Sequence, residues 1–194
     1  MTVVVHQRLI RREMRVRPEK LNMVIGAFFS EVGISLLHIF SESDPSAGSI
    51  RDSLMISTDW TDETFEAVEK ELRRYEYRIN IGELDLGYLK KYLSGGRDFL
   101  VRFMENPTLL EHESFTRLPR AVFHLTEELS SRNDIGNLPE SDRKHLVGDS
   151  RRAYVRLVDE WLDYMEHLKL NYPYLFSLAM RLNPFRKRPS PIVT

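Results

Sequence analysis

Apolar residues recur at three- and four-residue steps along most of this chain, and strand-type alternation is nearly absent. Between residues 18 and 40 they occupy most of the circumference of a predicted helix, which is typical of a helix surrounded by others. A proline fits its first position, and Asp44-Pro45 ends it. Gly26 and Gly33 share one face, which predicts the close approach of a second helix.

The other helices are predicted from their boundary residues. Thr61, Asp85 and Thr108 have the sequence context of N-terminal caps. Pro119 lies inside an apolar run and is predicted to kink or split that helix. The longest helix is predicted from Pro139 to about Leu170. The pattern predicts an all-α, single-domain bundle of about seven helices.

Three segments are predicted along the chain. Residues 1–17 form a basic N-terminal segment, residues 18–184 the helical domain, and residues 185–194 a mobile, basic and proline-rich tail. Within the domain, residues 77–81 are the only ones that alternate, and we expect a short extended stretch there.

Composition narrows the possible classes of protein. The 194 residues include 42% hydrophobic and 29% charged residues, as in a globular domain, and no cysteine. A disulfide scaffold, a thiolate metal site and a cysteine nucleophile are therefore excluded, and a reducing compartment is compatible with the sequence. The longest nearly uncharged run has ten residues, whereas about 20 are needed to span a bilayer, so we expect no membrane crossing.

The net charge of -1 conceals a segregation of charge. Residues 1–20 carry +4 and residues 181–194 carry +4, which leaves -9 for the body between them. An anionic membrane or a protein partner is a possible target of the basic start, with ordinary solvated charge as the alternative. Nucleic acid is an improbable partner, because the body is acidic and no aromatic residue is interleaved among the arginines. The candidate contact residues are Arg8, Arg11, Arg12, Arg15 and Arg17.

Histidines and acidic residues in the second half of the chain are the only candidates for a catalytic or metal site in the sequence. Three pairs have the spacing of one helix face: His124 with Glu127, Asp142 with His145, and Asp163 with His167. Helical di-metal sites use Glu-x-x-His motifs, which this chain lacks, so we expect solvated helix faces and no metal or cofactor. If the chain is an enzyme, the candidates are His124, Glu127, Asp149, Asp163 and His167.

Other standard catalytic motifs are absent from the sequence. It has no nucleophile elbow, no phosphate-binding P-loop and no dinucleotide-binding glycine motif. Gly95-Gly96 is predicted to end a helix rather than to cradle a phosphate, because no strand precedes it and no lysine follows in the required position.

Three strings resemble those of an uncharacterised prokaryotic family of helical cytosolic domains: LNMVIGAFFSEVG at 21–33, AVFHLTEEL at 121–129 and YPYLFSLA at 172–179. The resemblance covers most of residues 10–185. It implies no assigned activity, and some members have an N-terminal membrane anchor. Residues 1–17 would then correspond to the cytoplasmic exit of such an anchor, which this chain lacks. Pro119 departs from the family pattern, where a helix-compatible residue is expected.

We therefore predict a non-catalytic cytoplasmic interaction or regulatory module, held near the inner face of the membrane. The competing hypothesis is a helical enzyme that uses histidines and carboxylates of the C-terminal half in metal or acid–base chemistry. The two differ in one observable property. An enzyme gathers these side chains in one place, whereas an adaptor scatters them and exposes an apolar or charged patch.

Overall fold

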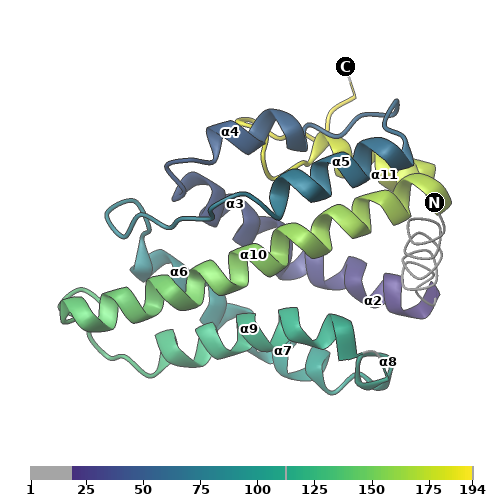
Figure 1. Ribbon diagram of the computed structural model, residues 1–194. Coiled ribbons are helices and arrows are strands. Elements are labelled where there is room, and N and C mark those ends of the chain that lie inside the picture. Colours follow the sequence, from purple (N-terminus) through teal and green to yellow (C-terminus); the bar gives the residue numbers. More distant parts are fainter. Residues whose placement is uncertain (1–18, 112, 194) are drawn as a thin grey trace, which may run out of the picture.

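Helices make up most of the described structure, which is a computed structural model that describes residues 19–111 and 113–193 (Figure 1). No strand occurs among those residues. The helices are α2 (Glu19–Phe28), α3 (Ile34–Glu42), α4 (Gly48–Arg51), α5 (Asp62–Leu72), α6 (Leu86–Gly95), α7 (Arg97–Met104), α8 (Pro107–Leu110), α9 (Glu113–Ser130), α10 (Glu140–Asn171) and α11 (Pro173–Arg181). With α2 and α3 counted as one rod, seven described helices have eight or more residues, which confirms the all-α prediction.

The rod from Glu19 to Glu42 is the core helix. One π-helical turn, η1 (Phe29–Gly33), joins α2 to α3. By length and composition this rod is apolar enough to cross a membrane, with a mean hydropathy of 1.8. Its side chains Ile25, Phe28 and Leu36 are fully buried by the rest of the domain, so we interpret it as the central helix of the bundle.

Gly26 allows the closest approach between this rod and α10. A Cβ atom at Gly26 would lie 2.8 Å from the Tyr164 hydroxyl oxygen, too close for any larger residue without a shift of that ring. The Tyr164 ring stacks on Phe29, with ring centroids 5.4 Å apart and planes 15° apart. Gly26 therefore serves helix packing, as predicted.

Most of the predicted helix boundaries are confirmed. The Thr61 side chain accepts a hydrogen bond from the backbone N–H of Thr64, and the rings of Trp60 and Phe65 pack as a hydrophobic staple with centroids 4.9 Å apart. Asp85 caps α6 by accepting from Tyr88 N–H at 2.9 Å. Gly95 is the last residue of α6, as predicted. No described glycine has a positive φ, so this helix does not end in a left-handed glycine conformation.

The structure corrects two predictions about helix boundaries. Asn106, not Thr108, is the cap of α8: its side chain accepts from the backbone N–H of Thr108. Pro119 does not split its helix, because α9 is continuous through it. The buried neighbours Phe115 and Leu118 hold the helix in place there, so packing outweighs the lost backbone hydrogen bond. The stretch predicted at residues 77–81 forms no strand, and residues 75–80 alternate in burial.

The 32-residue helix α10 passes along the whole domain, as Figure 1 shows in green. It packs against α9 near its start, against the α2–α3 rod and α5 further on, and against α11 near its end. The predicted stripe of Tyr154, Leu157, Trp161, Met165 and Leu168 is buried.

Packed structure extends past the predicted domain end at residue 184. Asn183 donates from Nδ2 to the Leu54 carbonyl at 2.7 Å, and its Oδ1 accepts from Phe185 N–H at 2.9 Å. The buried Phe185 ring meets the Trp161 ring edge-on, with centroids 5.2 Å apart. At least the first residue of the predicted tail therefore belongs to the core.

Substitution of Trp161 by alanine should remove the largest fully buried side chain, which is 1% exposed. We expect a loss of about 3 to 5 kcal/mol in the free energy of unfolding, because the cavity cannot collapse between α10 and Phe185. Urea unfolding measures it. Tyr174→Ala, at a side chain 94% exposed, is the control and should change stability by less than about 0.5 kcal/mol. A Trp161 loss below about 1 kcal/mol would contradict the assigned core.

Candidate metal centre

The helices α9 and α10 form an antiparallel hairpin around the loop 131–139. Asp134 shapes this loop by accepting from Gly136 N–H at 3.2 Å and from Asn137 Nδ2 at 2.7 Å. Arg132 then joins the two helices, because its guanidinium donates to both carboxylate oxygens of Asp142 at 2.6 and 2.7 Å. The end of α9 and the start of α10 are thereby fixed opposite each other.

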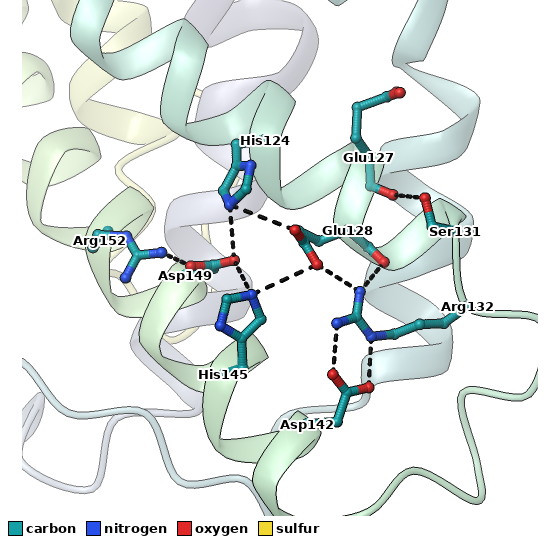
Figure 2. A network of polar contacts seen from close by, with 9 residues as sticks. All are labelled: His124, Glu127, Glu128, Ser131, Arg132, Asp142, His145, Asp149 and Arg152. Carbon is teal, nitrogen blue, oxygen red and sulfur yellow. Dashed lines mark hydrogen bonds and ion pairs between the residues drawn. The ribbon is translucent and has the colours of Figure 1, made fainter.

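Four potential metal ligands meet across this hairpin (Figure 2). His124 and Glu128 come from α9, and His145 and Asp149 from α10. One ligand atom from each side chain lies within 4.8 Å of every other. Each helix contributes a histidine and, four residues later, an acid, so that both members of each pair point from the same face.

Asp149 is the buried member of the cluster. Its side chain is 1% exposed, and neither carboxylate oxygen has a well-formed hydrogen bond within the described residues. Instead, the Nε2 atoms of His124 and His145 lie 3.3 and 3.4 Å from its Oδ2. A buried carboxylate is costly unless a charge or a metal compensates it. Arg152 compensates this charge at Oδ1, and Oδ2, which faces the two imidazoles, is the oxygen that a metal ion would bind.

The distances from the two histidines to the two carboxylates are close to those around a tetrahedral ion. Bonds of 2.0 to 2.2 Å from zinc to nitrogen and oxygen place neighbouring ligand atoms about 3.3 to 3.6 Å apart. The Nε2 atoms of His124 and His145 lie 3.3 and 3.4 Å from the same oxygen of Asp149, Oδ2. Glu128 meets the two histidines with different oxygens: Oε1 lies 3.8 Å from His124 Nε2, and Oε2 lies 3.6 Å from His145 Nε2. With both imidazoles neutral, the two carboxylates bring a charge of -2 to the ion, which they share with the guanidinium groups of Arg132 and Arg152 outside the cluster.

Two arginines orient the carboxylates from outside the cluster. Arg132 donates to a Glu128 carboxylate oxygen at 2.8 Å, and Arg152 contacts Asp149 Oδ1. The hydrogen bond from Arg132 is the main cause that lowers the pKa of Glu128, and likewise that of Asp142. Both carboxyls therefore stay ionised, as metal ligands or their supports must.

Comparison with known proteins shows the family of the chain. A family model described as the C-terminal helical domain of uncharacterized protein MJ1433 matches residues 17–181. The chain belongs to this family. It is 50% identical over 184 residues to uncharacterized protein MJ1433 of Methanocaldococcus jannaschii, an alignment that covers 95% of this chain and 74% of that protein. No solved structure matches the chain.

This chain of the MJ1433 family brings together only two of the five candidate residues for chemistry, His124 and Asp149. Glu127 points away from the cluster (Figure 2). Its carboxylate accepts a hydrogen bond from Arg97 Nε at 2.7 Å. Asp163 and His167 lie 14 and 18 residues further along α10, roughly 21 and 27 Å from Asp149. His167 and Asp163 therefore do not converge with His124 and Asp149.

His167 instead has a packing role at the far end of α10. Its Nδ1 lies 3.2 Å from Asn22 Nδ2 and 3.1 Å from Asn171 Nδ2, and its ring packs against Tyr172. The candidate membrane-contact residues, Arg8, Arg11, Arg12, Arg15 and Arg17, lie outside the described residues.

Sequence reasoning missed Glu128 and the partner of His145. The pairs proposed from sequence were His124 with Glu127 and Asp142 with His145, both at i, i+3. In the structure each histidine lies beside the acid four residues later on its helix, and Asp142 forms an ion pair with Arg132. The available signal was the repetition of His-x-x-x-acid on two helices joined by a short loop.

The Arg132 contacts predict how stability depends on pH. Glu128 and Asp142 have lowered pKa values in the fold, so their contribution is complete above their unfolded values of about 4 and is lost as the pH falls through the folded values. We expect Arg132→Ala to weaken the fold at pH 7 and to flatten the loss of stability between about pH 4.5 and 3. Urea unfolding at three pH values tests this.

The matched control is Arg120→Ala, at an exposed position of the same helix. It should leave the pH profile unchanged. Identical profiles for Arg132→Ala and the unmodified protein would mean that Arg132 does not hold these carboxyls ionised.

Proposed function

We propose that this domain is a metal-stabilised, non-catalytic interaction module that binds one divalent transition metal ion, preferentially zinc. The observation that carries the proposal is the near-tetrahedral convergence of His124, Glu128, His145 and the buried Asp149. Imidazole and carboxylate ligands suit zinc, although iron, nickel and copper share the preference for imidazole.

Four protein ligands argue for a structural ion. Catalytic zinc sites keep a position open for water, whereas structural sites are closed by four protein side chains. An ion here would join α9 to α10 beside the Arg132–Asp142 pair and would neutralise the buried Asp149. This role agrees with the expected interaction module rather than with the competing enzyme. It departs from the sequence-based expectation that the histidines and acids are only solvated faces.

Metal analysis tests the proposal. Protein purified without an affinity tag or chelator should contain about one metal ion per chain by inductively coupled plasma mass spectrometry. Removal of the ion should lower the melting temperature, because a ligand at 100 times its Kd stabilises a fold by about 2.7 kcal/mol. Titration of the apoprotein with zinc, iron, nickel and copper identifies the preferred ion.

Variants decide which side chains bind the ion. His124→Ala and His145→Ala should each weaken the zinc affinity at least about 100-fold, since they remove a direct ligand. Glu127→Gln and His167→Ala are matched controls that should retain full affinity. If the purified chain holds no metal and the apoprotein does not bind the four ions, the cluster is only an ion-pair network and the proposal fails.

We further propose that one end of the domain faces an anionic membrane on the cytoplasmic side. Exposed apolar side chains gather there, with Met23 and Leu175 lining one groove beside Glu19 and Tyr172. Tyr172 donates to Glu19 at 2.8 Å, so the basic segment 1–17 is attached next to this groove. Apolar contacts together with four or more cations, each worth about 1 kcal/mol, would give the two signals that stable anchoring needs.

Liposome co-sedimentation tests this second proposal. The chain should bind anionic vesicles at low salt and neutral vesicles much less. Glutamine at Arg8, Arg11, Arg12 and Arg15 should abolish the difference, and serine at Tyr174 and Leu175 should weaken binding about tenfold. Equal binding to both lipids would leave these charges as solvated surface and favour a protein partner for the apolar groove.

A further inference from the structure

A second polar site lies further along α10, on the side covered by the end of α5 and the segment after it. There a pocket of about 560 Å³ is lined by ten residues: Leu72, Arg73, Tyr75, Glu76, Tyr77, Arg151, Arg152, Val155, Arg156 and Asp159. Four of these are arginines and two are acids. The pocket is thus positive in a protein body whose sequence is acidic overall.

Two of the four arginines already form ion pairs with acidic residues. Arg73 contacts Glu69, one turn earlier on α5, and Arg152 contacts Asp149. Arg151 and Arg156 form no ion pair with another described residue. Of the two acids, Glu76 is paired with Arg78 at 2.6 Å, outside the pocket. Two guanidinium groups therefore have donors to offer to a ligand, and their fork geometry matches phosphate oxygens.

Tyr77 gives an independent indication of a ligand. It is 6% exposed and lines the pocket, and its hydroxyl has no hydrogen-bond partner among the described residues. The rings of Tyr75 and Tyr154 meet it edge-on, with centroids 4.7 and 5.1 Å away, so the ring is held in place. A buried hydroxyl without a partner costs stability, which a ligand oxygen would recover.

The remaining walls define the rest of the ligand. Leu72, Val155 and the Tyr75 ring are apolar and suit a flat or aliphatic body. Asp159 lines the pocket, where burial raises the pKa of its carboxyl to about 6, and it can accept a hydrogen bond from a hydroxyl or amine. An inorganic anion alone would use the arginines but leave these walls uncovered.

From these contacts we propose that the pocket binds a small organic phosphate, with the phosphate on Arg151 and Arg156, an oxygen at the Tyr77 hydroxyl and the apolar body against Leu72 and Val155. None of the four proposed metal ligands lines the pocket, so a phosphate can bind there whether or not the ion is present. It would make the module responsive to a metabolite.

Isothermal titration calorimetry with phenyl phosphate tests the proposal on the full chain. We expect saturable binding that is at least tenfold tighter than that of inorganic phosphate or sulfate, and no binding of phenol. Benzoate distinguishes a phosphate site from a general anion site: binding as tight as that of phenyl phosphate would overturn the phosphate assignment. Binding of phenol would show an apolar pocket and overturn the role of the arginines.

Three variants locate the site. Arg156→Ala should weaken phenyl phosphate binding about tenfold or more, whereas Arg120→Ala, an equal change of charge on α9, should not. Tyr77→Phe should weaken binding several-fold while the melting temperature stays the same or rises, because the lost hydroxyl has no partner in the free protein. Equal effects of Arg156→Ala and Arg120→Ala, or full binding by Tyr77→Phe and Arg156→Ala, would overturn the assignment.

Discussion

The packing of other elements along α10 is the interaction on which this fold depends. This helix is about 48 Å long, and no isolated helix of its composition would keep so many large apolar side chains in water. Each part of it is therefore covered by a different element: α9 at the start, the α2–α3 rod and α5 along the middle, and α11 at the end. The Trp161–Phe185 contact ties the C-terminal segment to the same helix.

Because α10 is long, it also keeps apart polar residues that all lie on the same helix. His145 and Asp149 lie in its second and third turns, the arginines of the pocket follow, and His167 is at the far end. Residues on one helix face meet only within one or two turns of each other. A polar site on such a helix therefore needs side chains from a second helix. Here α9 provides them, because the short loop and the Arg132–Asp142 pair hold it beside the start of α10.

The sequence predicted the parts of this fold that local physics determines. Thr61 and Asp85 cap helices because a side-chain oxygen satisfies a backbone donor close by, and the Tyr154–Leu168 stripe is buried because its period matches the helix. Pro119 was misjudged because the packing of Phe115 and Leu118, which is not local information, outweighs its helix-breaking tendency. The segment 75–80 alternates because one side packs on α10, without any partner strand.

The candidate site was only half predictable for the same reason. His124 and Asp149 are recognisable as residue types that bind metals, but their pairing depends on the register of α9 against α10. A shift of one residue in that register would exchange Glu128 for Glu127, which in the structure pairs with Arg97 instead. Single-sequence periodicity identifies the buried face of each helix and leaves the relative register open, so it could not choose between the two glutamates.

Arg152 links the two proposed sites, since it contacts Asp149 and also lines the arginine pocket. A divalent ion at Asp149 would compete electrostatically with the guanidinium for the carboxylate charge and so weaken the hold of Asp149 on Arg152. The guanidinium would then be freer to approach a phosphate in the pocket. Metal and phosphate should therefore favour each other's binding, and thermodynamic linkage requires the effect to be equal in both directions. The two sites would then be coupled through Arg152, which contacts the metal ligand Asp149 and lines the pocket but does not itself bind the metal.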